Sequence, residues 1–153
     1  MSLFPLPGFL AGRITPAQYE KWLDRRAVHL RALDKQRKRP YSFKNSIAVY
    51  KALIHFAVVN SGQYDPYTGE TLKWELIGTW VGRKTTDPQD APEKFEGKYA
   101  LMPTIDHRDP DALEFEIISW RVNSCKNYLI PKEFIALCGR VFRHQLKKRR
   151  VKK

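Results

Sequence analysis

Two helical patterns occupy the N-terminal part of the chain, and they restrict its fold more than any other feature of the sequence. Thr15 followed by Pro16 is typical of a helix start, and apolar residues then recur at helical spacing over residues 16–36. Pro40 breaks this pattern, and a second helix is predicted over residues 46–60. The sequence therefore predicts a helical hairpin whose tip is rich in basic residues.

Strand patterns follow the second helix. Leu72, Trp74 and Leu76 alternate with polar residues and predict a strand. Extended apolar patterns return over residues 98–105 and 115–120, and these two segments predict a further pair of strands. The segment between the first strand and this pair is rich in Gly, Pro and charged residues, which is typical of an exposed loop.

Two more helices are predicted near the C-terminus, one from Asn123 onward and one opened by Pro131. The whole pattern indicates an α+β protein with a helical region over residues 1–62, a mixed core over 63–146 and a basic tail over 147–153. The last helix carries an apolar stripe that we expect to be buried, formed by Phe134, Leu137, Cys138, Val141 and Phe142.

The net charge of +12 is concentrated at the two ends of the chain. Residues 13–44 carry +7 and residues 140–153 carry +8, whereas residues 51–139 carry −3. This distribution suits a protein that holds a polyanion with its ends and binds a cation at its centre, although solvated helix ends are the simpler alternative. The residues expected to contact a nucleic-acid backbone are Arg37, Lys38, Arg39, Lys147, Lys148, Arg149 and Arg150.

Several classes of protein are excluded or disfavoured by composition. A length of 153 residues allows one domain, and no apolar run approaches the roughly 18 residues that span a bilayer, so no membrane partner is expected. The apolar start, residues 1–10, lacks the charged segment of a signal peptide. Cys125 and Cys138 are too few for a disulfide scaffold or a four-thiolate zinc site, so we expect a reduced, cytoplasmic protein.

The residues that indicate chemistry lie around the last two predicted strands. Asp106 and His107 end the first of these strands, and Asn123-x-x-Lys126 opens the helix that follows the second. This order resembles the HNH family of nucleases, whose fold is the ββα-metal or His-Me finger. The turn over residues 67–70 is similar to one that often precedes the core in that family, and the resemblance covers residues 64–142.

The resemblance implies an endonuclease that depends on Mg²⁺ or Mn²⁺ and acts on nucleic acid, with double-stranded DNA as the expected partner. His107 would be the general base that activates water. Asp106 and Asn123 would supply oxygen ligands for the metal ion, and they can do so while His107 faces the other side of the strand. The residues expected to hold the scissile phosphate are Arg108, Arg121 and Lys126.

The chain departs from the family pattern in two places. The Asn expected nine residues before the helical Asn is replaced by Glu114, whose carboxylate we expect to orient His107, with Glu116 or Asp111 as alternatives. Paired Cys-x-x-Cys knuckles are also missing from the sequence, so no structural zinc is expected. The aromatic residues expected to pack in place of that clamp are Trp74, Trp80 and Trp120.

Plainer interpretations exist for each of these residues. Asp106 and His107 can belong to a surface turn, and Asn123 can be a helix N-cap. A non-catalytic nucleic-acid binder on the same scaffold is the alternative function, and an interaction module that uses the acidic loop 82–98 is a third. The isolated histidines expected to be structural are His29, His55 and His144.

Overall fold

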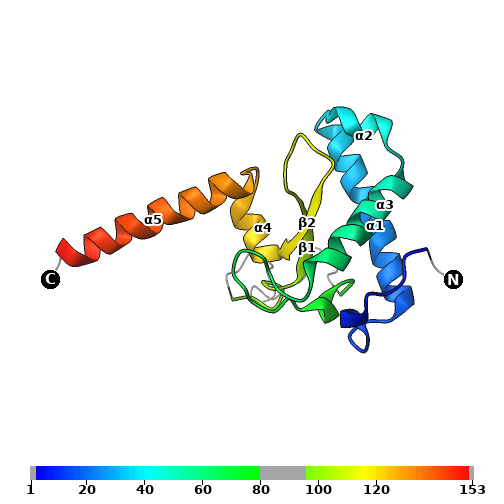
Figure 1. The fold of residues 1–153 in the computed structure, drawn as a ribbon, viewed down its shortest axis with the longest axis horizontal. Coiled ribbons are helices and arrows are strands. Elements are labelled where there is room, and N and C mark those ends of the chain that lie inside the picture. The colour runs from blue at the N-terminus through cyan, green and yellow to red at the C-terminus, as the bar shows by residue number, and fades with distance from the viewer. Residues whose placement is uncertain (1–2, 80–95, 152–153) are drawn as a thin grey trace, which may run out of the picture.

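The computed structural model describes residues 3–79 and 96–151, so Trp80 and most of the acidic loop lie outside the described residues. Helices and short strands follow one another along the chain (Figure 1). In order, the elements are a 3₁₀ helix Gly8–Leu10, α1 Pro16–Gln36, α2 Pro40–Lys44, α3 Ile47–Ser61, a 3₁₀ helix Trp74–Leu76, β1 Pro103–His107, β2 Phe115–Ser119, α4 Trp120–Lys126 and α5 Pro131–Val151.

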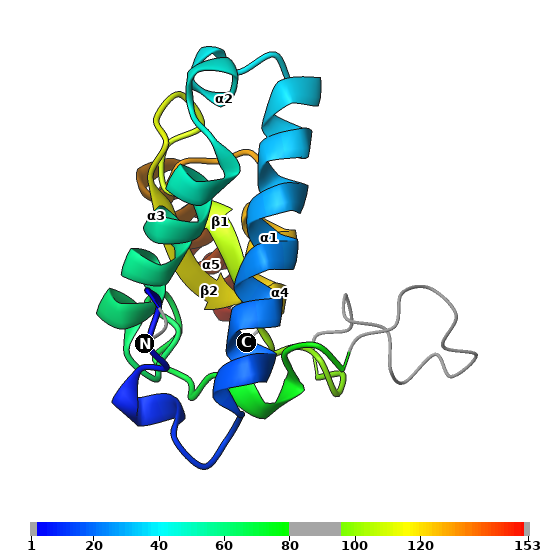
Figure 2. The ribbon, with the colours of Figure 1, turned by 90° about the vertical axis from the view of Figure 1, so that its right-hand side faces the viewer.

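The two strands form a small antiparallel sheet that lies between helices. α1 and α3 pack against each other on one side of this sheet, and α4 packs against both strands on the other side (Figures 1 and 2). The register pairs Asp106 with Glu116 and His107 with Phe115. The protein is therefore a mixed α+β structure, as the sequence predicts, and α4 directly follows the two-stranded sheet.

Local capping explains why the two N-terminal helices were predictable. The Thr15 hydroxyl accepts a hydrogen bond from the Gln18 backbone N–H, and the Gln18 side chain accepts one from the Thr15 N–H. Ser46 caps α3 by accepting from the N–H of Val49. These caps satisfy backbone donors that the first turn of a helix leaves unpaired. Both predicted helices are confirmed to within one residue at each end.

One hydrophobic core joins the N-terminal helices to the strands, so the boundary predicted at residue 62 does not separate two cores. Trp74 lies in this core with no exposed surface, as expected, whereas Trp120 is half-buried. Leu23 and Ile54 come from the helices, and Ile117 comes from β2. Because the helices bury their apolar faces against the strands, neither part has a complete core without the other.

The strand predicted around Trp74 is wrong, because Trp74–Leu76 is a short 3₁₀ helix. A strand needs a neighbouring strand. Among the described residues, this segment has only an isolated bridge between Tyr64 and Thr71 and a single hydrogen bond from the Lys73 N–H to the Leu101 carbonyl oxygen. The strand predicted from residue 98 is also shorter than expected, since residues 98–101 form turns.

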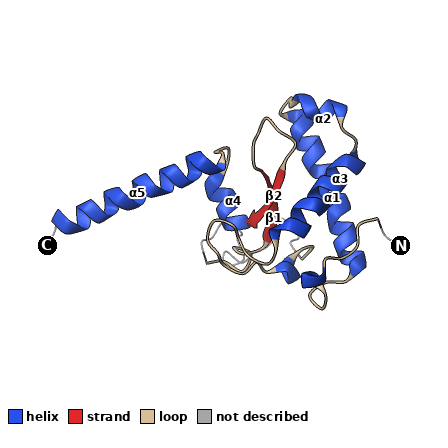
Figure 3. Cartoon of the chain, in the orientation of Figure 1, coloured by secondary structure: helices blue, strands red, loops and turns tan. Residues whose placement is uncertain are grey.

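The prediction that the apolar stripe of the last helix is buried is wrong except at Phe134, which is half-buried against Tyr67. α5 extends away from the rest of the protein (Figures 1 and 3), and Val141 and Phe142 are 55% and 65% exposed. Cys138 is an exposed free thiol. α5 continues to Val151, so residues 147–151 of the predicted basic tail belong to this helix, and residues 152–153 lie outside the described residues. None of the helices in the described ranges is long and apolar enough to cross a membrane.

Replacing Gly62 with Ala is expected to lower the free energy of unfolding by about 1–3 kcal/mol. Gly62 ends α3 with φ 66° and ψ −148°, a conformation that is open almost only to glycine, and an added Cβ would meet no atom within 4 Å. The cost is therefore conformational, and urea denaturation measures it. Gly139→Ala, within α5, is the matched control and should not destabilise the protein. Equal stability of Gly62→Ala and the wild type would contradict this account.

Candidate active site

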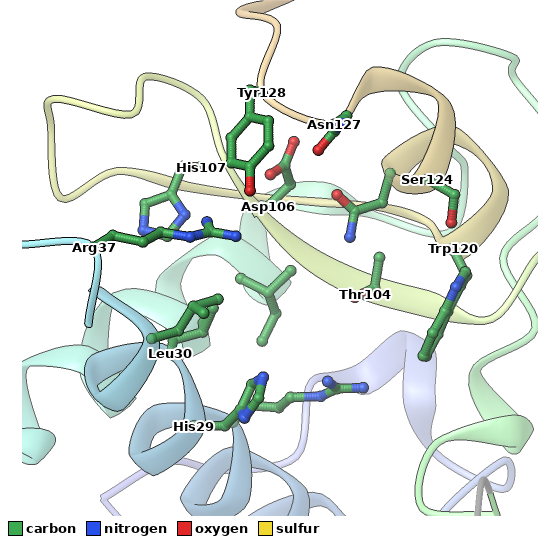
Figure 4. Close-up of a pocket in the computed structure, with 14 residues that line it drawn as sticks. His29, Leu30, Arg37, Thr104, Asp106, His107, Trp120, Ser124, Asn127 and Tyr128 are labelled. Carbon is green, nitrogen blue, oxygen red and sulfur yellow. The ribbon is translucent and has the colours of Figure 1, made fainter. Parts of the chain in front are cut away.

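A cleft of about 360 Å³ opens between α1, β1 and α4 (Figure 4). Asp106 and His107 at the end of β1 line it, and Asn123 on α4 lines it from the other side. α4 ends at Lys126. The C-cap residue Asn127 has φ 51°, which Asn tolerates better than most residues, and the following Tyr128 also borders the cleft. The structure thus brings together the three residues for which the sequence predicted the central roles.

The plainer interpretations of these three residues do not hold. Asp106 and His107 belong to a paired strand rather than a surface turn, and His107 is only 6% exposed. Ser119 is the N-cap of α4, because its hydroxyl accepts a hydrogen bond from the Val122 N–H. Asn123 therefore lies inside the helix, and its side-chain amide makes no hydrogen bond within the described ranges.

The turn before the sheet is fixed by a buried carboxylate. One oxygen of Asp65 accepts the backbone N–H groups of Tyr67 and Thr68, and the other accepts the Ser119 N–H at 2.6 Å. Asp65 is 1% exposed, so its charge is offset by these three donors. The turn predicted over residues 67–70 is thereby attached to the start of α4, which carries Asn123 into the cleft.

His107 is held by a carboxylate that the sequence analysis did not assign to the site. Its Nε2 lies 3.1 Å from one oxygen of Asp34, which comes from α1 and has no exposed surface. The Tyr50 hydroxyl donates to the same oxygen at 2.8 Å, and the Arg39 guanidinium donates to the other at 2.8 Å. Burial by itself would raise the pKa of Asp34, but the hydrogen bond and charge of His107, the hydroxyl of Tyr50 and the charge of Arg39 outweigh it and lower the pKa.

The second ring nitrogen of His107, Nδ1, faces the cleft. It has no hydrogen-bond partner in the described part of the chain. Among the described residues, the polar side-chain atoms that are both buried and without a hydrogen-bond partner are the indole nitrogens of Trp22 and Trp74. Nδ1 is unpaired but does not belong to this group, so it is not fully buried. Nδ1 is therefore accessible from the cleft, where His107 lies close to Arg37 and Tyr128 (Figure 4).

Asp106 belongs to a separate charge network on the opposite side of β1. The Lys126 ammonium, 1% exposed, donates to one oxygen of Asp106 at 2.6 Å and lies 3.5 Å from Glu116. The Tyr67 hydroxyl donates to Glu116 at 2.7 Å. Burial raises the pKa of Glu116 in spite of these two partners. The other oxygen of Asp106 accepts no hydrogen bond among residues 3–79 and 96–151, so it remains open to the cleft.

The prediction that Glu114 orients His107 is corrected by the register of the sheet. Because His107 pairs with Phe115, Glu114 lies just beyond the strand, where it is 56% exposed and accepts a hydrogen bond from Arg108 at 2.9 Å. Neither alternative residue reaches the ring, since Glu116 is engaged by Tyr67 and Lys126, and Asp111 makes only a local turn with Asp109.

The predicted phosphate contacts are also misplaced. Arg108 pairs with Glu114, Arg121 pairs with Glu70, and Lys126 is buried, and none of these three lines the cleft. Each of the two arginines pairs with one carboxylate, and Lys126 lies between Asp106 and Glu116. The residues predicted to contact nucleic acid lie in different surroundings. Arg37 lines the cleft, Lys38 is exposed, and Arg39 forms an ion pair with Asp34. On the projecting α5 the exposed residues are Lys147, Lys148 and Arg149, and Arg150 continues that helix.

One side of the cleft is a basic wall formed by Arg26, His29 and Arg37. The sequence did not predict that these three residues lie together. Arg26 and Arg37 have no carboxylate partner within the described ranges, and Arg37 lies over the Tyr128 ring at 5.1 Å. Burial lowers the pKa of Arg26, although a guanidinium stays charged near neutral pH. His29, which the sequence analysis expected to be structural, lines the cleft beside these two arginines. Of the other two such histidines, His55 bonds to the Tyr19 hydroxyl and His144 is exposed.

The donor set limits what kind of metal ion the cleft can hold. No group of three or more His, Cys, Asp or Glu side chains suited to a metal ion occurs in the residues that the structure describes. Asp106 and Asn123 offer one open carboxylate oxygen and one amide oxygen. That set fits Mg²⁺, which keeps most of its water ligands and binds through one or two protein oxygens together with substrate phosphates.

Comparisons of the chain with protein-family models, curated proteins and solved structures find no match. The geometry of the cleft is therefore the basis on which a function is proposed.

Replacing Lys126 with Met is expected to lower the free energy of unfolding by about 3–5 kcal/mol, because it leaves two neighbouring carboxylates without their buried cation. Urea denaturation followed by tryptophan fluorescence measures the change. Lys44→Met is the matched control, since Lys44 is exposed and makes no ion pair with a described residue. A loss as small as that of the control would show that the network adds nothing to stability.

Proposed function

We propose that this protein is a divalent-metal-dependent endonuclease of the HNH type that hydrolyses phosphodiester bonds, most naturally those of DNA. The observation that carries the proposal is the meeting of Asp106, His107 and Asn123 in one cleft, on a strand pair and the helix that follows it. Three further features support it: the open Nδ1 of His107, the open oxygen of Asp106, and the basic wall.

His107 is the proposed general base. Its Nδ1 is accessible from the cleft, and neutral imidazole accepts a proton from water near neutral pH. The ring is fixed by neighbours on its other sides, with Phe115 at 4.9 Å and Tyr41 at 6.4 Å between ring centroids. A base that is held in one orientation loses little entropy when it acts.

Asp106 and Asn123 are the proposed ligands of Mg²⁺ or Mn²⁺, and the ion would supply positive charge for the phosphate and the leaving oxygen. Lys126 holds Asp106 from the protein side, so the carboxylate keeps one orientation while its open oxygen faces the cleft. Asn123 adds a neutral ligand, which leaves the net charge of the ion available to the substrate.

The basic wall is the proposed contact for the substrate backbone. Arg26 and Arg37 stand opposite the acidic side of the cleft, and neither is neutralised by a carboxylate among the described residues. Guanidinium groups bind phosphate oxygens through two parallel hydrogen bonds, whereas they contact base edges only in a groove. The wall therefore favours binding that follows the backbone rather than the sequence.

A non-catalytic nucleic-acid binder is the second candidate, and one observation favours it. Lys126 already satisfies one oxygen of Asp106 at 2.6 Å, so the carboxylate is paired without any metal ion. On this alternative the same basic wall binds phosphates, and binding does not require a divalent ion.

Supercoiled plasmid incubated with MgCl₂ is expected to be nicked by the wild type, and His107→Ala and Asn123→Ala are each expected to slow nicking by about 10²–10⁴-fold. His144→Ala is the matched control, because His144 is exposed on α5. Full activity of His107→Ala would contradict the proposal. Tight, salt-dependent binding without cleavage of DNA or RNA would favour the non-catalytic alternative.

The double substitution Arg26→Met and Arg37→Met is expected to raise KM for plasmid by about 10-fold or more while kcat changes little. It should also reduce the slope of log affinity against log salt by about two, as measured by fluorescence anisotropy with a short DNA duplex. Lys21→Met removes an exposed charge from α1 outside the cleft and should change neither KM nor the slope appreciably. An unchanged slope in the double variant would exclude the wall from the DNA interface.

A further inference from the structure

Asp34 is a charged residue at a fully buried position of α1, where an apolar residue would be expected. It continues the buried stripe of α1 formed by Leu23, Ala27 and Leu30, and it has no exposed surface. A buried carboxylate costs several kcal/mol of desolvation, and a well-packed apolar residue in its place is often neutral or stabilising. Stability alone therefore does not explain why α1 places an acid there.

The partners of Asp34 show what the carboxylate holds. Arg39 and Tyr50 come from the N-terminal helical region and fix the two carboxylate oxygens at 2.8 Å each. The third partner, His107, lies 73 residues away in the sequence and lines the cleft. The contacts with Arg39 and Tyr50 thus fix the position of the carboxylate, and the third contact joins it to His107, the proposed base.

We infer that Asp34 is the positioning residue of His107, and that it takes the role predicted for Glu114. This inference rests on the proposed function. The ionised carboxylate accepts the Nε2–H of the ring, which leaves the lone pair of the neutral imidazole on Nδ1, the atom that faces the cleft. Asp34 itself does not touch the substrate.

Other carboxylates near the sheet are committed elsewhere. Asp106 and Glu116 are paired with Lys126 on the opposite side of β1, and Glu114 is paired with Arg108 in solvent. Among the described residues, Asp34 is thus the carboxylate that contacts His107. The helical hairpin then contributes to the site as well as to the core.

Two readouts test the inference separately. The first is the proton spectrum of the metal-free protein, in which the Nε2–H of His107 should give a downfield resonance that exchanges slowly with water. The second is plasmid nicking with MgCl₂ at several plasmid concentrations, which separates kcat from KM. The spectrum needs no activity, so it reports on the Asp34–His107 contact even if the proposed function fails.

Asp34→Ala is expected to lose the resonance and to lower kcat by about 10²-fold with KM little changed. Asp34→Asn offers a side-chain carbonyl to the same N–H but turns its NH₂ group toward Arg39, so it should keep the resonance and recover only part of kcat. Tyr19→Phe is the matched control, since it removes a 2.9 Å hydrogen bond to His55 between α1 and α3 away from the cleft. This variant should lose stability but keep both readouts.

Three results would overturn the inference. One is absence of the resonance in the wild type. Another is a kcat for Asp34→Ala that equals the wild-type value, which would make Asp34 a purely structural residue. The last is a wild type that shows the resonance but cleaves no nucleic acid, which would remove the proposed function and leave only a structural contact.

Discussion

The hydrogen bond between Asp34 and His107 joins the helical layer to the strand that carries the candidate site. It crosses 73 residues of sequence and connects two groups that are both nearly inaccessible to solvent. A buried charge without such a partner would be strongly unfavourable, so the contact constrains how α1 is placed against β1. The position of the cleft, which lies between α1, β1 and α4, follows from that placement.

β1 separates two charge networks. On one side, Asp34 is surrounded by hydrogen-bond donors, and on the other, Lys126 lies between Asp106 and Glu116. This separation results from the alternation of side chains along a strand, which sends two adjacent residues to opposite faces. Two neighbouring residues can therefore have independent electrostatic environments, one suited to proton transfer and one suited to a cation.

Features that depend on local sequence were predictable, and features that depend on distant partners were not. The caps at Thr15 and Ser46 lie within three residues of the groups they bind, and the two long helices were predicted almost to the residue. The strand around Trp74 failed because alternation says nothing about whether a neighbouring strand exists. Glu114 was misassigned because register decides which residue faces the ring. A signal for Asp34 was present, namely an acid within an apolar helical stripe, but its partner came from the far part of the chain.

The shared hydrophobic core also determines whether the candidate site could be separated from the rest of the chain. A strand–strand–helix segment that carried its own core would behave as a cassette, able to be excised or joined to unrelated sequences. Here the apolar faces of β1 and β2 are covered by residues of the N-terminal helices, and one of those helices supplies the buried carboxylate that contacts His107. The strand–strand–helix segment and the helical hairpin are consequently a single packing unit, in which a change in the packing of either one affects the other.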